Sequence, residues 1–407
     1  MSAPLFTPIQ QTPPAPRKPR RWRRYIGKGL TWGAFAVMLL AIAVFMGLQL
    51  GFGLTLAAGG AALIPFGMLF LVIRWIDRFT PEPRGALFFA FAWGAIASVF
   101  AALVLGGVIE VALAFNGATR EAANFIGPVI QAPLVEEGAK SAGILILLIF
   151  GRRYIAGPID GIVYAALIAA GFAFTENILY FGRALQESGI SGDSSNFWAV
   201  FVMRGVFSPF AHVCFTSLAG FGAGVAAERR YLPLYFTLLP GMIGFGMLLH
   251  ALWNGSGFYL PALGFGQNAS AILVWYLALQ VPIFLFLGSV VIWLRWREKK
   301  ILRRQLTVYG RAGWFSPQEV EMMVSLRKRR RARRWAARSG ALPLAAMREF
   351  QLAAGELAVQ RNAAINGEFG EKARRTEMSL LERVTAARRK LSALSYPVVA
   401  TPPPHTS

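Results

Sequence analysis

The chain has 407 residues, of which 55% are hydrophobic and 15% are charged, and its mean hydropathy is +0.48. This composition excludes an ordinary soluble protein and favours an integral membrane protein. The net charge of +22 would suit a nucleic-acid-binding protein, but the basic residues lie between and after apolar stretches, as the positive-inside rule expects, so no nucleic-acid partner is predicted.

The first thirty residues are expected to be disordered and cytoplasmic. The stretch from Pro4 to Pro19 is rich in proline, and the basic residues from Arg20 to Lys28 are expected to anchor the first apolar stretch. About thirty residues precede that stretch, far more than the n-region of a signal peptide, so none is predicted.

Eight stretches are long and apolar enough to be predicted as transmembrane helices. They cover residues 31–50, 54–73, 85–113, 127–150, 159–181, 201–226, 232–253 and 271–293. The first two are joined by only three residues, Gly51 to Gly53, and are predicted to form a hairpin over 31–84, ahead of a membrane core at 85–296. Pro209 is a place where the sixth span could bend. The predicted fold is therefore an all-α, polytopic membrane bundle.

The basic residues predict that both termini lie in the cytoplasm. With the N-terminus inside, inner connections hold pairs such as Arg152–Arg153 and Arg229–Arg230, whereas the outer ones hold Arg120 and Arg183. This asymmetry follows the positive-inside rule and requires an even number of spans. We expect a multi-pass protein of the cell membrane.

Residues 297–407 have a soluble composition and are predicted to form a basic, helical cytosolic tail. The residues from Ser316 to Glu319 form a helix-capping pattern, and the stretch from Glu371 to Leu394 has apolar residues on one helical face. The basic run from Arg327 to Arg334 favours a tail held near anionic lipid, with docking of a cytosolic partner as the alternative. Residues after Pro397 are expected to be disordered.

Ionisable residues inside the spans indicate a function, because charged groups in hydrocarbon are costly and face the bundle interior. At 1.5 Å per helical residue, Glu136, Glu176, His212 and His250 lie roughly 6–16 Å below the outer surface. Their spans alternate in direction, so sequence order does not force this agreement. The third histidine of the chain, His405, lies in the tail. We expect one polar site beneath the extracytoplasmic face.

Spacing within each helix indicates which of these groups share a face. Glu136 and Lys140 are four residues apart and can pair. Glu137 points about 100° away from Glu136, so one carboxylate can face the site while a partner holds the other. His250 and Asn254 are again four residues apart and can project into one cavity.

Two other interpretations of these residues stay open. A buried glutamate or histidine is often a hydrogen-bond link between helices, and chains of such groups also mark proton or ion pathways. The alternative to an enzyme is therefore a non-enzymatic membrane channel, transporter or sensor. Cys214, two residues from His212, is interpreted as a small packing residue rather than a nucleophile.

Four motifs at these positions resemble those of the PrsW family of intramembrane proteases. They are an EExxK motif at Glu136 to Lys140, an FxxxEN motif at Phe172 to Asn177, and the segments from His212 to Thr216 and from His250 to Asn254. Their order, and their places in or at the end of spans, make the resemblance specific. It covers residues 85–296.

The resemblance implies a membrane-embedded protease that hydrolyses membrane-anchored protein substrates, with an anti-sigma factor as the best-known kind of target. The family is also similar to the prenyl-protein (CAAX) endopeptidases. By that similarity Glu136 is the water-activating base, with Glu137 as the alternative, and His250 and Asn254 lie at the developing oxyanion. Glu176 stands where the CAAX enzymes carry a histidine, so a prenylated substrate is not expected.

The resemblance leaves two possibilities for a metal. Glu176, His212 and His250 would form an adequate zinc set with water in the fourth position. The HExxH motif is absent, and the CAAX relatives look like glutamate-dependent enzymes. Glu176 and His212 therefore either bind zinc or complete the water site of a metal-independent enzyme.

Overall fold

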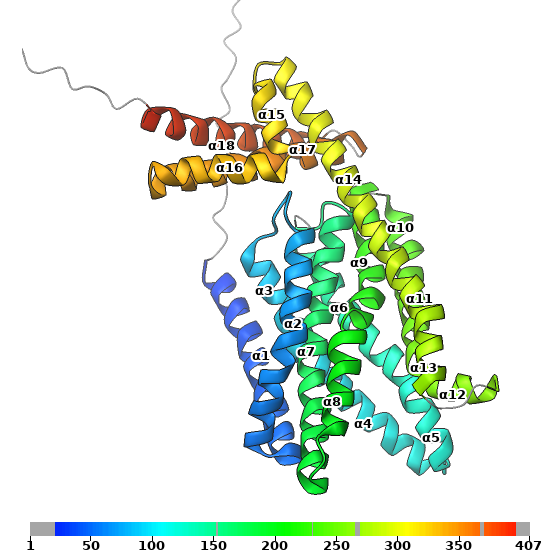
Figure 1. Ribbon diagram of the computed structural model, residues 1–407. Helices are drawn as coiled ribbons and strands as arrows, with labels where there is room; N and C mark the ends of the chain where they lie inside the picture. The colour runs from blue at the N-terminus through cyan, green and yellow to red at the C-terminus, as the bar shows by residue number, and fades with distance from the viewer. Residues whose placement is uncertain (1–20, 152–153, 230, 265–268, 367–369, 396–407) are drawn as a thin grey trace, which may run out of the picture.

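The computed structural model describes residues 21–151, 154–229, 231–264, 269–366 and 370–395, and these form helices with no β-strand among them (Figure 1). The predicted all-α class is confirmed. The predictions for residues 1–20, for Arg152 and Arg153, for Arg230 and for the chain after Ser395, with His405, lie outside the described residues.

The helices of the bundle run up and down in chain order (Figure 1). Short π-helical segments within the spans carry the label η. The first half comprises α1 (Arg21–Leu50), α2 (Phe52–Ile76), α3 (Arg84–Ala92), η1 (Trp93–Ser98), α4 (Val99–Phe115), α5 (Arg120–Ile126), η2 (Gly127–Gln131), α6 (Ala132–Phe150) and α7 (Pro158–Ser191). The second half comprises α8 (Ser195–Val202), η3 (Met203–Phe207), α9 (Ala211–Arg229), α10 (Leu232–Phe236), α11 (Leu238–Asn254), α12 (Ser256–Ala262), α13 (Ala269–Trp275), η4 (Tyr276–Gln280) and α14 (Val281–Arg311).

Seven helices of the described chain are long and apolar enough to cross a membrane. They correspond to seven of the eight predicted spans. The eighth, α6, forms over 19 residues, but Glu136, Glu137 and Lys140 make it too charged for this group. The helix that carries the paired glutamates is thus the one predicted span that lies outside this group.

Two local features shape the spans as predicted. Gly51, at φ +78°, is the single residue between α1 and α2, and it allows the tight hairpin because glycine adopts this conformation without a steric penalty. The sixth span is interrupted between Phe207 and Ala211, where Pro209 lacks the N–H that a continuous helix needs.

Glycines bring the central helices α7 and α9 into close contact. A Cβ atom built on Gly161 would lie 2.0 Å from the carbonyl oxygen of Gly220, and one on Gly220 would lie 2.2 Å from that of Gly161. Close approach through small residues is the usual way in which membrane helices pack, because lipid supplies no hydrophobic driving force between them. This contact sets the distance between the helices that carry Glu176 and His212.

The C-terminal segment forms α15 (Pro317–Met323), α16 (Leu326–Arg338), α17 (Ala341–Asn366) and α18 (Glu371–Ser395), which lie across one end of the bundle (Figure 1). The predicted capping box is confirmed, since the Ser316 hydroxyl accepts from the Glu319 amide at 3.2 Å and the Glu319 carboxylate accepts from the Ser316 amide at 2.8 Å. The predicted helix from Glu371 is also confirmed. Phe79, from the connection between α2 and α3, is buried in the core of this segment beside Phe350 and Leu357.

Candidate active site

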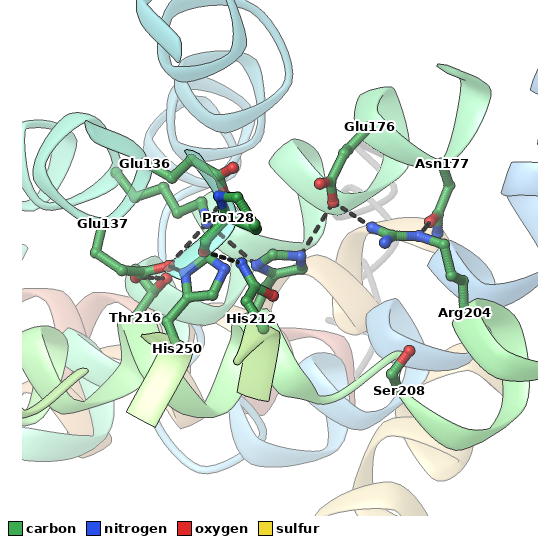
Figure 2. A network of polar contacts seen from close by, with 12 residues as sticks. Pro128, Glu136, Glu137, Glu176, Asn177, Arg204, Ser208, His212, Thr216 and His250 are labelled. Carbon is green, nitrogen blue, oxygen red and sulfur yellow. Dashed lines mark hydrogen bonds and ion pairs between the residues drawn. The ribbon is translucent and has the colours of Figure 1, made fainter. Parts of the chain in front are cut away.

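Glu137 of α6 is held by three partners (Figure 2). Its Oε1 accepts from Lys140 Nζ at 2.8 Å and lies 3.1 Å from His250 Nδ1, and its Oε2 accepts from the Thr216 hydroxyl at 2.7 Å. The side chain is only 2% exposed. A carboxylate bound on both oxygens is suited to orienting its neighbours.

Glu136 points elsewhere, as the 100° step between adjacent helical residues requires. Its Oε2 lies 3.3 Å from Lys140 Nζ, its side chain is 14% exposed, and it lines a cavity of about 550 Å³. One carboxylate therefore faces open space while its neighbour is held. The spacing in the sequence had left open which of the two glutamates would face the site and which would be held by a partner.

Lys140 lies between these groups and is fully buried. Besides the two glutamates, its Nζ lies 3.2 Å from His212 Nδ1 and 3.8 Å from the ring centroid of Phe172. An ammonium group between two carboxylates offsets their mutual repulsion where water is scarce.

Glu176 of α7 lies on the other side of His212. Its Oε2 lies 3.0 Å from His212 Nε2 and also pairs with Arg204, whose Nε donates to Asn177 Oδ1 at 2.8 Å (Figure 2). Since Nδ1 of His212 faces the Lys140 ammonium and Nε2 faces a carboxylate, these partners assign the proton of a neutral ring to Nε2.

His250 of α11 is buried against the same groups. Its ring stacks on Phe215 with a centroid distance of 5.2 Å, and it also lies 5.2 Å from the ring of His212. Because Glu137 engages Nδ1, Nε2 is the nitrogen that remains available to water, substrate or metal. The nearby Asn254 donates from Nδ2 to the Pro128 carbonyl at 2.9 Å, which ties the end of α11 to the segment before α6.

Glu136, His212 and His250 each offer a ligand atom, and these atoms lie within 4.8 Å of one another. The predicted ligand set contained Glu176 in place of Glu136. In the structure Glu176 and Glu137 stand behind the two histidines, as orienting carboxylates do in metal sites. Two imidazoles and one carboxylate are a donor set that suits a catalytic zinc ion, with a position left for water. The Lys140 ammonium lies 3.2 Å from His212 Nδ1 and 3.3 Å from Glu136 Oε2, so an ion can bind these ligands only when this side chain moves aside.

The sequence analysis gave no role in the site to two residues that support it. Thr216 lies one helical turn after His212 on α9, and this four-residue spacing could have indicated that both face the same neighbours. Trp93 of η1 donates from Nε1 to the Ala139 carbonyl at 2.9 Å and so braces α6 beside the glutamates. No local sequence pattern identifies that contact, because 46 residues separate its partners.

Residues 82–287 match the protein family described as PrsW family intramembrane metalloprotease. Protease PrsW of Clostridioides difficile (strain 630) is 30% identical over 202 residues, which are 47% of this chain and 79% of that protein. Protease PrsW of Geobacillus kaustophilus (strain HTA426) is 26% identical over 155 residues, 37% of this chain and 60% of that relative. No solved structure matches the chain. The matched region contains the whole polar layer and excludes α1, α2 and the tail helices.

Proposed function

Since this chain belongs to the PrsW family of intramembrane metalloproteases and is a peptidase, we propose that its polar layer hydrolyses membrane-anchored proteins near the extracytoplasmic face. One observation supports this assignment above the others. Carboxylates and imidazoles from α6, α7, α9 and α11 converge beside a cavity that reaches Glu136.

Peptide hydrolysis needs an activated water, a stabilised oxyanion and a protonated leaving amine. We assign the proton transfers to Glu136, which takes a proton from the attacking water and returns it to the amine. Lys140 fixes the position of this carboxylate. The oxyanion would accept a hydrogen bond from the second N–H of Asn254, one helical turn after His250.

A divalent ion would be held by Glu136, His212 and His250. When bound, such an ion activates water and polarises the scissile carbonyl. Glu137 and Glu176 would keep His250 and His212 in the required orientation. Glu136 lies at the reacting water whether or not the site holds a divalent ion. Metal analysis of active purified protein distinguishes the metal-dependent arrangement from the metal-independent one.

Glu136→Gln tests the assignment, with a membrane-anchored reporter protein as the substrate. We expect at least a hundredfold loss of cleavage, because the amide cannot accept the proton of water. His250→Ala should show a loss of the same order. Glu121→Gln on α5 is the matched control, since this exposed glutamate lies outside the polar layer. Normal cleavage in both site variants, at normal protein levels, would favour a channel, transporter or sensor instead.

At a finer level, we propose that the natural substrate is a membrane-anchored anti-sigma factor, as the family resemblance implies. The basic, helical tail favours a further cytosolic contact, with anionic lipid or with a partner protein. Cells that carry Glu136→Gln should retain the uncut anti-sigma factor, and its normal removal in those cells would exclude it as the substrate.

A further inference from the structure

The cavity beside Glu136 lies between two helices that carry none of the catalytic candidates. Its walls are α1, through Ile42 and Phe45, and α4, through Leu103 and Gly107, and its inner end is the start of α6. Its volume of about 550 Å³ is typical of ligand-binding pockets, which range over about 300–1,000 Å³. It is therefore large enough for several residues of a peptide.

The cavity opens at the lipid-facing surface. Val104 both lines it and is 47% exposed, and Val108, one turn further along α4, is 61% exposed. Leu40, next to the cavity on α1, is 65% exposed. Exposed apolar side chains on membrane-spanning helices face hydrocarbon, so the opening between α1 and α4 leads into the bilayer.

The lining suits a polypeptide backbone better than a bulky side chain. Gly106 and Gly107 leave the surface of α4 without side chains, which permits close approach of another backbone. Gln131 donates from Nε2 to the Gly106 carbonyl at 3.2 Å, but its Oε1 is buried and has no hydrogen-bond partner among the described residues. This acceptor lies five residues before Glu136, and a backbone N–H of a bound peptide would satisfy it.

Opposite charges line the outer part of the cavity. Arg183 lies two turns beyond Glu176 on α7, roughly 10 Å nearer the outer end of that helix. Glu110, near the end of α4, lines the same cavity. A peptide that runs outward from Glu136 therefore passes from an apolar channel to a charged mouth.

We propose that this groove between α1 and α4 receives an extended stretch of the substrate's membrane-spanning segment, which enters from the lipid and presents its scissile carbonyl to Glu136. The proposal rests on the proposed function and adds to it the path and form of the substrate. A helix is about 10–12 Å wide and its carbonyls are bonded internally, whereas an extended segment exposes them. Substrates should therefore carry weak helix formers such as glycine or proline at the cut.

Gly107→Phe tests the path by filling the groove. A Cβ at Gly107 meets no atom within 4 Å, so a side chain can leave the backbone there without a clash. Gly60→Phe on α2 is the matched control, because Gly60 is exposed and also has no atom within 4 Å. We expect Gly107→Phe to reduce kcat/KM for the membrane-anchored reporter at least tenfold and Gly60→Phe to leave it within twofold of wild type.

Photo-crosslinking keeps the proposal testable should the filled variant fold poorly. In protein that carries Glu136→Gln, a benzophenone amino acid in place of Leu103 should crosslink to the reporter, whereas one in place of the lipid-exposed Leu56 on α2 should not. Crosslinks at Leu56 alone, or full activity of Gly107→Phe, would overturn the proposed path. Persistent cleavage by Glu136→Gln would instead contradict the proposed function, so the two failures are distinguishable.

Discussion

Lys140 shows how a single residue allows three glutamates to share a poorly hydrated layer. Its ammonium contacts Glu136 and Glu137, and it faces His212, whose opposite nitrogen contacts Glu176. Removal of one partner from a buried ion pair leaves an uncompensated charge, which is more costly than the intact pair is stabilising. The lysine is therefore expected to matter for folding as much as for catalysis.

Lys140→Met should lower the free energy of unfolding by about 3–5 kcal/mol, because it leaves the Glu137 carboxylate buried beside a methyl group. The measurement is denaturant unfolding of the purified protein in detergent micelles. Lys300→Met is the control, since this lysine of α14 is exposed. Equal stability of the two variants would contradict the structural role assigned to Lys140.

At the scale of helices, the contact between α7 and α9 determines whether Glu176 can reach His212. Gly220→Ala would place a methyl group 2.2 Å from the Gly161 carbonyl oxygen, so the helices must separate. We expect a destabilisation of about 1–3 kcal/mol together with reduced cleavage, because overpacking moves backbone. Gly189→Ala on α7 is the control and should behave like wild type, because a Cβ at Gly189 meets no atom within 4 Å. Thermal unfolding and reporter cleavage together check this, and an unaffected Gly220→Ala would show that the contact is looser.

The connection between α2 and α3 carries two carboxyl groups outside the spanning segments. Burial raises the pKa of Asp77 from 3.8 to about 7, although the Glu82 amide and Arg74 oppose the change. Burial, and next the charge of Asp160, raise the pKa of Glu82 from 4.5 to about 10, against the effect of its bond to Tyr164. Both groups keep their protons to higher pH in the folded chain than in the unfolded chain.

These raised values predict a fold that becomes less stable as pH rises. The contribution of each protonated carboxyl group to the free energy of unfolding is complete below about pH 4. It is lost as the pH rises through about 7 for Asp77 and about 10 for Glu82, because the unfolded chain ionises first. Between about pH 5 and about pH 9, the Tm of Glu82→Gln should fall less than that of wild type. Glu121→Gln should keep the wild-type slope, and identical slopes for Glu82→Gln and wild type would contradict the prediction.

For the whole molecule, the position of Phe79 inside the tail core joins the C-terminal helices to the bundle. Arg329 of α16 donates to the Phe79 carbonyl at 2.6 Å, and Thr80 donates to Glu298 at 2.7 Å, so the same connection contacts both α16 and α14. The tail is thus packed on the bundle, at the end where the positive-inside rule places the cytoplasm.

Both termini are predicted to be cytoplasmic, and single cysteines can test this. In a Cys214→Ala background, Gln186→Cys near the end of α7 should react with a membrane-impermeant maleimide on intact cells. Ser339→Cys, exposed after α16, should react only after the cells are opened. Labelling of Ser339→Cys on intact cells would invert the topology.

The amino-acid sequence alone was sufficient for the membrane class and the positions of the helices. Apolar length and helical periodicity are local properties, so they can be read from consecutive residues. The capping box at Ser316 and the interruption at Pro209 are local in the same sense. Among the predicted spans, α6 alone is not apolar enough for a candidate membrane helix, because the residues needed for the site are those that make it polar.

Only the tertiary structure decided how the polar layer is divided among its members. Glu137 is bound by Thr216 and His250, which lie 79 and 113 residues away, while the adjacent Glu136 faces the cavity. Likewise Glu176 lies behind His212, and Asn254 contacts the Pro128 carbonyl. Such contacts depend on how helices rotate and cross when they pack, and no spacing within one helix specifies the rotation of another.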